Sequence, residues 1–265
     1  MKSPLSIFVV LAVTLSCTSG TNTQDAAVEE SAEVEEIVSQ EESVEEAPVL
    51  LSPATSRFKA MTEFTFDKAL LDSLKKPYSI VDYFLLAPTQ IFGGLDRMAV
   101  LKTEEEPVSS PGGGCFPNIK ALDRRNGFME FVCNGDGGGE SFQITFWKQK
   151  GQPDLVGFNK TTWGMCCDES ELLFLQLVEG EWNNVTSQVL PDINYKIFMK
   201  PGTENVNQNV AAGYLAELPK SGKDISLRVM GDLLSEGLAG LPELRSSIDA
   251  EKTVTLFYDS GKFSF

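Results

Sequence analysis

Apolar and polar residues alternate along much of the second half of the chain. Residues 141–146 alternate strictly, and residues 225–229 repeat the pattern. Alternation with a period of two predicts β-strands with one buried face. Residues 172–178 are apolar on both faces, which is typical of a central strand. Shorter runs of the same kind predict further strands at 128–133, 155–158, 195–199, 214–218 and 253–258, and a last short edge at Phe263 and Phe265.

The region before these strands has a helical pattern instead. Residues 67–76 place Leu70, Leu71 and Leu74 on one face. An acid begins the segment, lysines end it and Pro77 follows at once. These residues fit a helix because its dipole favours those charges and because proline cannot continue it.

Two more helices are expected next in the chain. One begins at Ser79, with Asp82 three residues later as a capping box, and ends before Pro88. The other covers residues 95–102. Residues 232–248 are rich in leucine but contain Gly and Pro, so we expect a broken helix or a loop there.

Turn-forming residues join neighbouring strands directly. Gly, Pro, Asn and Asp cluster at 134–139, 150–154, 219–222 and 259–261. Connections this short can join only antiparallel strands. The predicted fold class is therefore α+β, a mostly antiparallel sheet with N-terminal helices, in a single β-rich domain over residues 57–265.

Residues 1–16 have the features of a signal peptide. A basic residue near the start precedes an apolar run at 5–15 that is too short to span a bilayer as a helix. The run ends with a small residue before Cys17, which resembles the lipobox of bacterial lipoproteins in the looser form of Bacteroidota. Thr14 stands where that family usually has Leu. The alternative is an ordinary secreted protein in which Cys17 has no role.

The lipobox resemblance implies cleavage before Cys17 and attachment of palmitate-type acyl chains to its side chain and N-terminus. It predicts a lipid-anchored protein of the bacterial cell envelope. The outer membrane is the expected location, on either its periplasmic or its surface side.

Residues 17–56 form an acidic linker that begins at this cysteine. Residues 18–56 contain ten acids, no Lys or Arg and no aromatic residue. Such a segment cannot bury enough apolar surface to offset the entropy of ordering it. We therefore expect a disordered tether between the membrane and the domain.

A second resemblance covers most of the domain. Gly180-Glu181-Trp182-Asn183-Asn184-Val185-Thr186 and Leu190-Pro191 resemble a pattern found in uncharacterised exported proteins of Bacteroidota. Leu218-Pro219-Lys220-Ser221-Gly222 and Gly261-Lys262-Phe263 fit the same pattern. The resemblance implies an exported lipoprotein with one β-rich domain of unknown function, and it implies no activity.

Charge and composition exclude several functions. The formal net charge is −16 and the chain contains no histidine. The charge argues against general nucleic-acid binding, which needs clustered Lys and Arg. The lack of histidine removes Ser-His-Asp and Cys-His catalysis and histidine-based metal sites. We expect no cofactor and no metal, and we assign no catalytic residue.

Four cysteines follow Cys17, and an even set in an exported chain suggests disulfides. They are Cys115, Cys133, Cys166 and Cys167. A bridge between the two adjacent cysteines would leave Cys115 to pair with Cys133. Alternatively, Cys166 and Cys167 each pair outward from a turn. A redox role would be a third reading, but the Cys-x-x-Cys spacing is missing.

Three groups of residues are candidates for catalysis or ligand binding. Asp168, Glu169 and Glu171 cluster after the cysteine pair, and two carboxylates about 5–10 Å apart can hydrolyse a glycosidic bond without histidine. Asn134, Asp136 and Glu140 offer oxygens in a Gly-rich loop, but their spacing is not that of an EF-hand and a plain hairpin is expected. Three tryptophans could stack on a sugar, but packing at the edge of the core is the expected role: Trp147 on the polar face of its strand, and Trp163 and Trp182 beside turns.

These observations predict a lipid-anchored envelope protein with a non-catalytic domain that binds a ligand or partner or has a structural role. A glycan or another envelope protein is the partner class we consider, besides the membrane itself. The alternative is an exported carboxylate-dependent hydrolase that resembles a glycosidase.

Overall fold

A computed structural model describes residues 60–93, 95–103, 116–135, 137–164, 169–203, 212–230 and 241–265. All of them belong to one compact unit, Ala47–Phe265. Only the backbone is described for Phe116 and Glu169. The predicted signal peptide and acidic linker lie outside the described residues and stay predictions.

Four short helices come first, and their caps follow from the sequence. They are α2 (Lys68–Ser73), α3 (Ile80–Leu86), α4 (Thr89–Phe92) and α5 (Arg97–Lys102). The Asp67 side chain accepts a hydrogen bond from the Leu70 amide and caps α2. Ser79 and Asp82 form the predicted capping box of α3. The predicted helices are thus confirmed with shorter bounds, and α4 follows Pro88 as an additional single turn.

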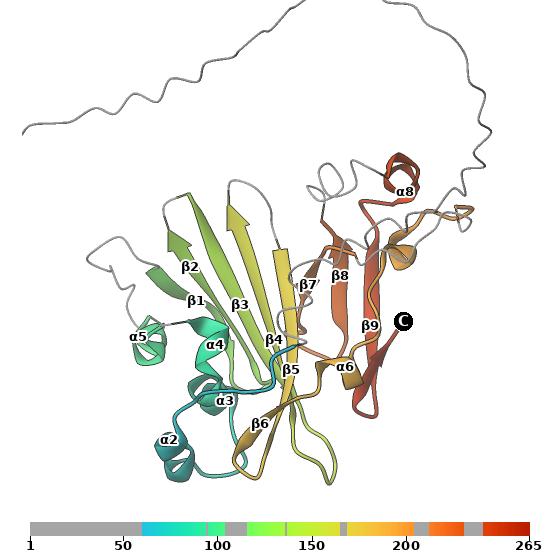
Figure 1. The fold of residues 1–265 in the computed structure, drawn as a ribbon. Coiled ribbons are helices and arrows are strands. Elements are labelled where there is room, and N and C mark those ends of the chain that lie inside the picture. The colour runs from blue at the N-terminus through green and yellow to red at the C-terminus, as the bar shows by residue number, and fades with distance from the viewer. Residues whose placement is uncertain are drawn as a thin grey trace, which may run out of the picture. The chain divides into compact units, whose positions relative to one another are not determined.

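Six strands form the larger sheet, and each pairs antiparallel with the next strand along the chain. Their order in the sheet is the order of the sequence, so only a few residues separate each strand from its neighbour along the chain (Figure 1). The strands are β1 (Phe116–Asp123), β2 (Phe128–Gly135), β3 (Gly138–Trp147), β4 (Leu155–Gly164), β5 (Glu169–Val178) and β6 (Glu181–Asn184).

A second antiparallel sheet has the order β10-β9-β8-β7. Its strands are β7 (Tyr214–Glu217), β8 (Ile225–Val229), β9 (Thr253–Asp259) and β10 (Lys262–Ser264). The short helices α6 (Thr186–Val189) and α8 (Pro242–Ser247) and the 3-10 helix η1 (Tyr195–Phe198) accompany it. The predicted α+β class with mostly antiparallel strands is confirmed.

The prediction of a strand at 195–199 is wrong, because this segment contains the 3-10 helix η1. The Asn194 side chain accepts a hydrogen bond from the Lys196 amide and starts that turn. Tyr195 and Phe198 are three residues apart, so a 3-10 turn buries both on one side. The apolar run therefore fits period three as well as period two. Two strands, β1 and β6, were not predicted.

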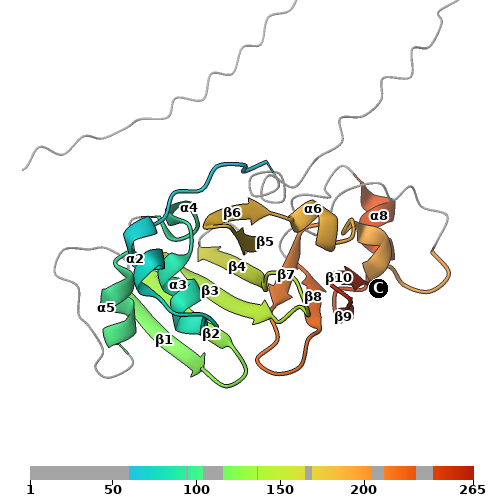
Figure 2. The same ribbon diagram turned by 90° about the horizontal axis from the view of Figure 1, so that it is seen from below.

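The larger sheet lies in the middle of three layers (Figure 2). Helices α2 to α5 cover one face, where Phe84, Phe92, Phe131 and Phe142 form an aromatic cluster in the first core. The second sheet, with α6, η1 and α8, packs against the other face around a second core. Both faces of the central strands are therefore buried.

This burial corrects the expected position of Trp147. The sequence places it on the polar face of its strand, but the side chain is only 4% exposed and packs in the second core. Its indole Nε1 donates a hydrogen bond to the Lys223 carbonyl at 2.9 Å. Gln143 and Thr145 make this face polar in the sequence, yet both of these side chains are buried as well.

The polar residues on that face join the two sheets. β7 is an edge strand, so its outward backbone groups have no strand partner. The Asn159 Nδ2 donates to the Ala216 carbonyl at 2.6 Å, and the Ala216 amide donates to the Ser170 Oγ at 3.1 Å. The Leu218 amide donates to the Gln143 Oε1 at 3.0 Å. Side chains of the larger sheet thus satisfy the edge of the smaller one.

Candidate functional site

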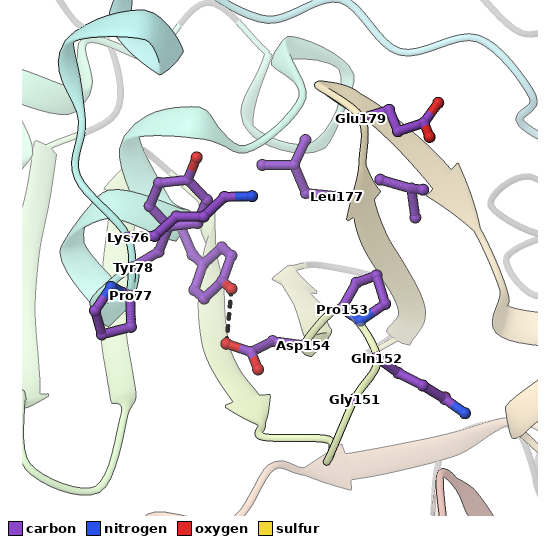
Figure 3. Close-up of a pocket in the computed structure, with 11 residues that line it drawn as sticks. Lys76, Pro77, Tyr78, Gly151, Gln152, Pro153, Asp154, Leu177 and Glu179 are labelled. Atoms are coloured by element: carbon purple, nitrogen blue, oxygen red, sulfur yellow. Dashed lines mark hydrogen bonds between the residues drawn. The ribbon is translucent and has the colours of Figure 1, made fainter.

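A cleft of about 760 Å³ opens at the end of the larger sheet where the β3–β4 and β5–β6 turns lie (Figure 3). The segment between α2 and α3, the helix α3, the β3–β4 turn and the end of β5 form its walls. The lining residues are Lys76, Pro77, Tyr78, Tyr83, Gly151, Gln152, Pro153, Asp154, Leu177, Val178 and Glu179.

A tyrosine–aspartate pair joins two of these walls. The Tyr83 hydroxyl donates to the Asp154 Oδ2 at 2.9 Å. Burial, followed by this hydrogen bond, raises the pKa of Tyr83 well above its ordinary value of 10.0. The hydroxyl therefore keeps its proton and stays a donor to the carboxylate. Among the described residues no second partner is found for this carboxylate, so its Oδ1 can accept a hydrogen bond from a ligand.

Aromatic packing holds Tyr83 in place. Its ring lies 5.1 Å from the Phe146 ring and 6.3 Å from the Trp182 ring. The Trp182 Nε1 in turn donates to the Leu86 carbonyl at the end of α3 at 2.9 Å. These contacts hold the middle and the C-terminal end of α3 against the sheet, so the Tyr83 hydroxyl has little freedom to move away from Asp154.

Tyr78 gives the cleft a half-buried aromatic surface. Its ring meets the Tyr83 ring edge to face, with 5.7 Å between the centroids. The Lys76 ammonium lies 5.9 Å from the centroid of the Tyr78 ring. The cleft therefore combines an aromatic face with an adjacent cation and with the Asp154 carboxylate.

The opposite wall is mostly apolar. Leu177 points toward the cleft and Pro153 lies at its edge, whereas the Glu179 carboxylate points away from Asp154 (Figure 3). Because the two carboxylates do not converge, they do not form the facing pair that glycoside hydrolysis uses. The polar groups that face the cleft suit binding of a hydroxyl-rich molecule with an apolar face.

Of the predicted carboxylate cluster, only the Glu171 side chain lies within the described residues. Asp168 and the side chain of Glu169 lie outside the description. Glu171 is half-buried on β5, six residues before Leu177 in an extended strand, and thus about 20 Å from the cleft. The structure does not bring Glu171 to the cleft.

Of the four predicted disulfide cysteines, only Cys133 lies within the described residues. It is buried on β2 and is disulfide-bonded. Cys115, Cys166 and Cys167 lie outside the description, as does Cys17, so the connectivity and the lipidation stay predictions.

The tryptophans have structural roles, as expected. Trp147 and Trp182 are buried, and the Trp163 ring lies against Gly139 on the neighbouring strand. The Gly-rich loop is the β2–β3 hairpin, with Asn134 paired to Gly139. Asp136 lies outside the description.

Two features are absent from the described part of the chain. Among the described residues, no group of three or more His, Cys, Asp or Glu side chains lies close enough together to hold a metal ion. None of the described helices has the length and hydropathy needed to cross a bilayer.

Comparisons with known proteins give no functional assignment. No protein-family model and no curated protein matches the chain. A domain of an uncharacterised protein from Porphyromonas gingivalis W83, a member of the Bacteroidota, is a distant structural neighbour. It has 9% sequence identity and a TM-score of 0.43, over 76% of this chain and 98% of the neighbour. This likeness is too distant to support an argument about function.

Sequence reasoning identified the pieces of the cleft without recognising a site. The turn predicted at 150–154 is confirmed, whereas α2 ends at Ser73, before the predicted stop at Pro77. Tyr83 and Asp154 are 71 residues apart in the chain, and only the packing of α3 on the sheet brings them together. The one local feature of the sequence that could have indicated a binding site is Tyr78, an aromatic residue that follows Pro77 in a loop.

Proposed function

We propose that the protein is a lipid-anchored envelope protein whose β-rich domain binds a glycan in the cleft. The Tyr83–Asp154 pair beside the half-buried Tyr78 ring is the observation that carries the proposal. The anchor at Cys17 rests on the lipobox resemblance and the acidic linker of the sequence.

A sugar fits the cleft by its chemistry. The C–H face of a pyranose packs on an aromatic ring, and its hydroxyls donate to carboxylates. Tyr78 offers the ring, and Asp154 offers an acceptor whose orientation Tyr83 fixes. A preorganised acceptor favours binding because less entropy is lost when the ligand arrives.

A glycan array followed by calorimetry tests the proposal with the purified full chain. We expect Tyr78→Ala and Asp154→Asn each to weaken binding of the selected glycan at least tenfold. Phe257→Ala and Asp72→Asn are matched controls, because both side chains are exposed and outside the cleft lining. Equal affinity in the cleft variants and the controls would refute binding at this site.

The same samples address the hydrolase alternative. Binding without product supports the proposal. Release of shortened glycan that is lost in Glu171→Gln or Asp154→Asn would assign a carboxylate-dependent hydrolase instead.

Mass spectrometry of the protein purified from a bacterial envelope tests the anchor. We expect a mature N-terminus at Cys17 that carries acyl chains, and loss of both cleavage and lipid in Cys17→Ala. An unmodified N-terminus at another residue would contradict lipid anchoring but would leave the cleft proposal intact.

A further inference from the structure

Several turns that carry basic residues lie together at the end of the two sheets where the cleft opens. The β7–β8 turn touches the end of β3, because the Trp147 Nε1 donates to the Lys223 carbonyl at 2.9 Å. It also touches the start of β2, because the Lys220 Nζ lies 3.0 Å from the Glu130 Oε2. Figure 2 shows the β1–β2 and β7–β8 turns near each other at this end.

A second groove, of about 540 Å³, lies between these two turns. Arg124, Arg125 and Lys220 line it together with Asp123 and an apolar floor that includes Phe128. The Lys220 ammonium lies 5.7 Å from the centroid of the Phe128 ring, so its stem covers the floor while its charge stays at the rim.

Asp123 is the acid among the residues that line this groove, and its carboxylate is hydrogen-bonded within its own turn. The Asp123 carboxylate accepts hydrogen bonds from the Arg125 and Asn126 amides and from the Asn126 side chain. These bonds lower the pKa of Asp123, the Asn126 amide contributing most. Asp123 thus closes the turn that presents the two arginines.

The charge at this end contrasts with the rest of the domain. Residues 57–265 carry a net charge of −7. Residues 123–126, 148–150 and 220–223 together carry six Lys or Arg and one acid. Two acids follow these turns, and both accept hydrogen bonds within the domain: Asp154 from the Tyr83 hydroxyl, and the exposed Asp224 from the Tyr258 amide.

We infer that this groove binds the carboxylate groups of an acidic polysaccharide whose sugar rings also occupy the cleft. The inference rests on the proposed glycan binding and narrows its ligand class. Guanidinium groups pair with carboxylates through two parallel hydrogen bonds, which suits the exposed Arg125 side chain in the groove lining.

The spacing of the turns allows one polysaccharide chain to occupy both the cleft and the second groove. The β3–β4 turn, which lines the cleft, lies two strand spacings from the β1–β2 turn, about 10 Å. Lys148 and Lys150 are exposed on the β3–β4 turn and continue the positive surface between the two. A groove between turns fits an extended chain better than it fits the flat surface of a bilayer.

Polygalacturonate and its methyl ester provide matched probes, because they share their sugar and differ in charge. With the full chain, we expect tight binding of polygalacturonate, at least tenfold weaker binding of the ester, and weaker binding as salt rises. Arg125→Glu and Lys220→Gln should each weaken polygalacturonate binding at least fivefold. Arg228→Glu on β8 is the control, since this exposed residue lies outside the groove lining.

Circular dichroism and melting temperature establish that each variant is folded. Arg125 provides the safer variant, because its hydrogen bond to Asp123 uses the backbone amide and its side chain is exposed. Lys220→Gln removes the charge but also shortens the stem that covers Phe128, so its result is compared with that of Arg125→Glu.

Three results would overturn the inference. Equal binding of ester and polygalacturonate, unchanged in Arg125→Glu, would exclude the groove but leave glycan binding in the cleft. Equal binding of polyphosphate, or of phosphatidylglycerol vesicles, would replace the polysaccharide by a general polyanion or a membrane. Loss of binding in Arg125→Glu, with unchanged binding in Tyr78→Ala and Asp154→Asn, would refute glycan binding in the cleft. It would also exclude an acidic polysaccharide that occupies both sites.

Discussion

Asn159→Ala tests how the two sheets are held together. The Asn159 side chain is 2% exposed, and its Nδ2 donates to the Ala216 carbonyl at 2.6 Å and to the Gln143 Oε1 at 3.3 Å. Its Oδ1 has no partner among the described residues, so removing that atom costs no hydrogen bond. Gln143 keeps the bond from the Leu218 amide.

The cost of the substitution therefore comes mainly from the Ala216 carbonyl. A buried acceptor that loses its donor costs about 1–3 kcal/mol. We expect a loss of about 2 kcal/mol in the free energy of unfolding. For a domain of this size, that corresponds to a fall in melting temperature of about 4–8 °C.

Urea unfolding and calorimetry of the full chain measure the effect. The urea midpoint should fall while the slope m stays constant, because the same surface is exposed on unfolding. Asn183→Ala on β6 is the matched control, since its amide makes only an exposed bond to the Glu181 carbonyl. The control should change stability by less than about 0.5 kcal/mol. An equally small change in Asn159→Ala would refute the role assigned to this residue.

Two further predictions concern packing and pH. Gly157→Ala should destabilise the domain by about 1–3 kcal/mol, because an added Cβ would lie 2.7 Å from the Trp147 ring. Gly164→Ala, whose Cβ would meet nothing within 3.5 Å, should cost less in the same urea experiment. The lowered pKa of Asp123 means that its stabilisation of the turn is complete above the ordinary aspartate value of about 3.9 and is lost as pH falls through the lowered value. An NMR titration of the Asp123 carboxyl that gave a value at or above the ordinary one would contradict the hydrogen bonds assigned to it.

Local patterns predicted the elements better than they predicted the layers. Ser79 and Asp82 specify a helix start through contacts three residues apart, and the structure confirms it. The alternation at 141–146 correctly predicted a strand. It could not show that the face with Gln143 is covered by a second sheet, because Leu218, its partner, lies 75 residues away.

The candidate sites depend even more on long-range packing. The turn at 150–154 was predicted, but nothing near it in the sequence shows that Tyr83 reaches Asp154. In the same way, Arg125 and Lys220 belong to turns of different sheets and meet only because those sheets stack. The segment at Tyr195 was ambiguous for a local reason, because four residues with three apolar side chains fit a strand or a 3-10 turn equally well.

An NMR titration of the isotope-labelled full chain with the glycan selected on the array tests glycan binding most directly. We predict that amide shifts concentrate at residues 76–83, 151–154 and 177–179, which line the cleft. Shifts confined to other described segments, such as η1 and α8, with none in the cleft, would contradict the proposal.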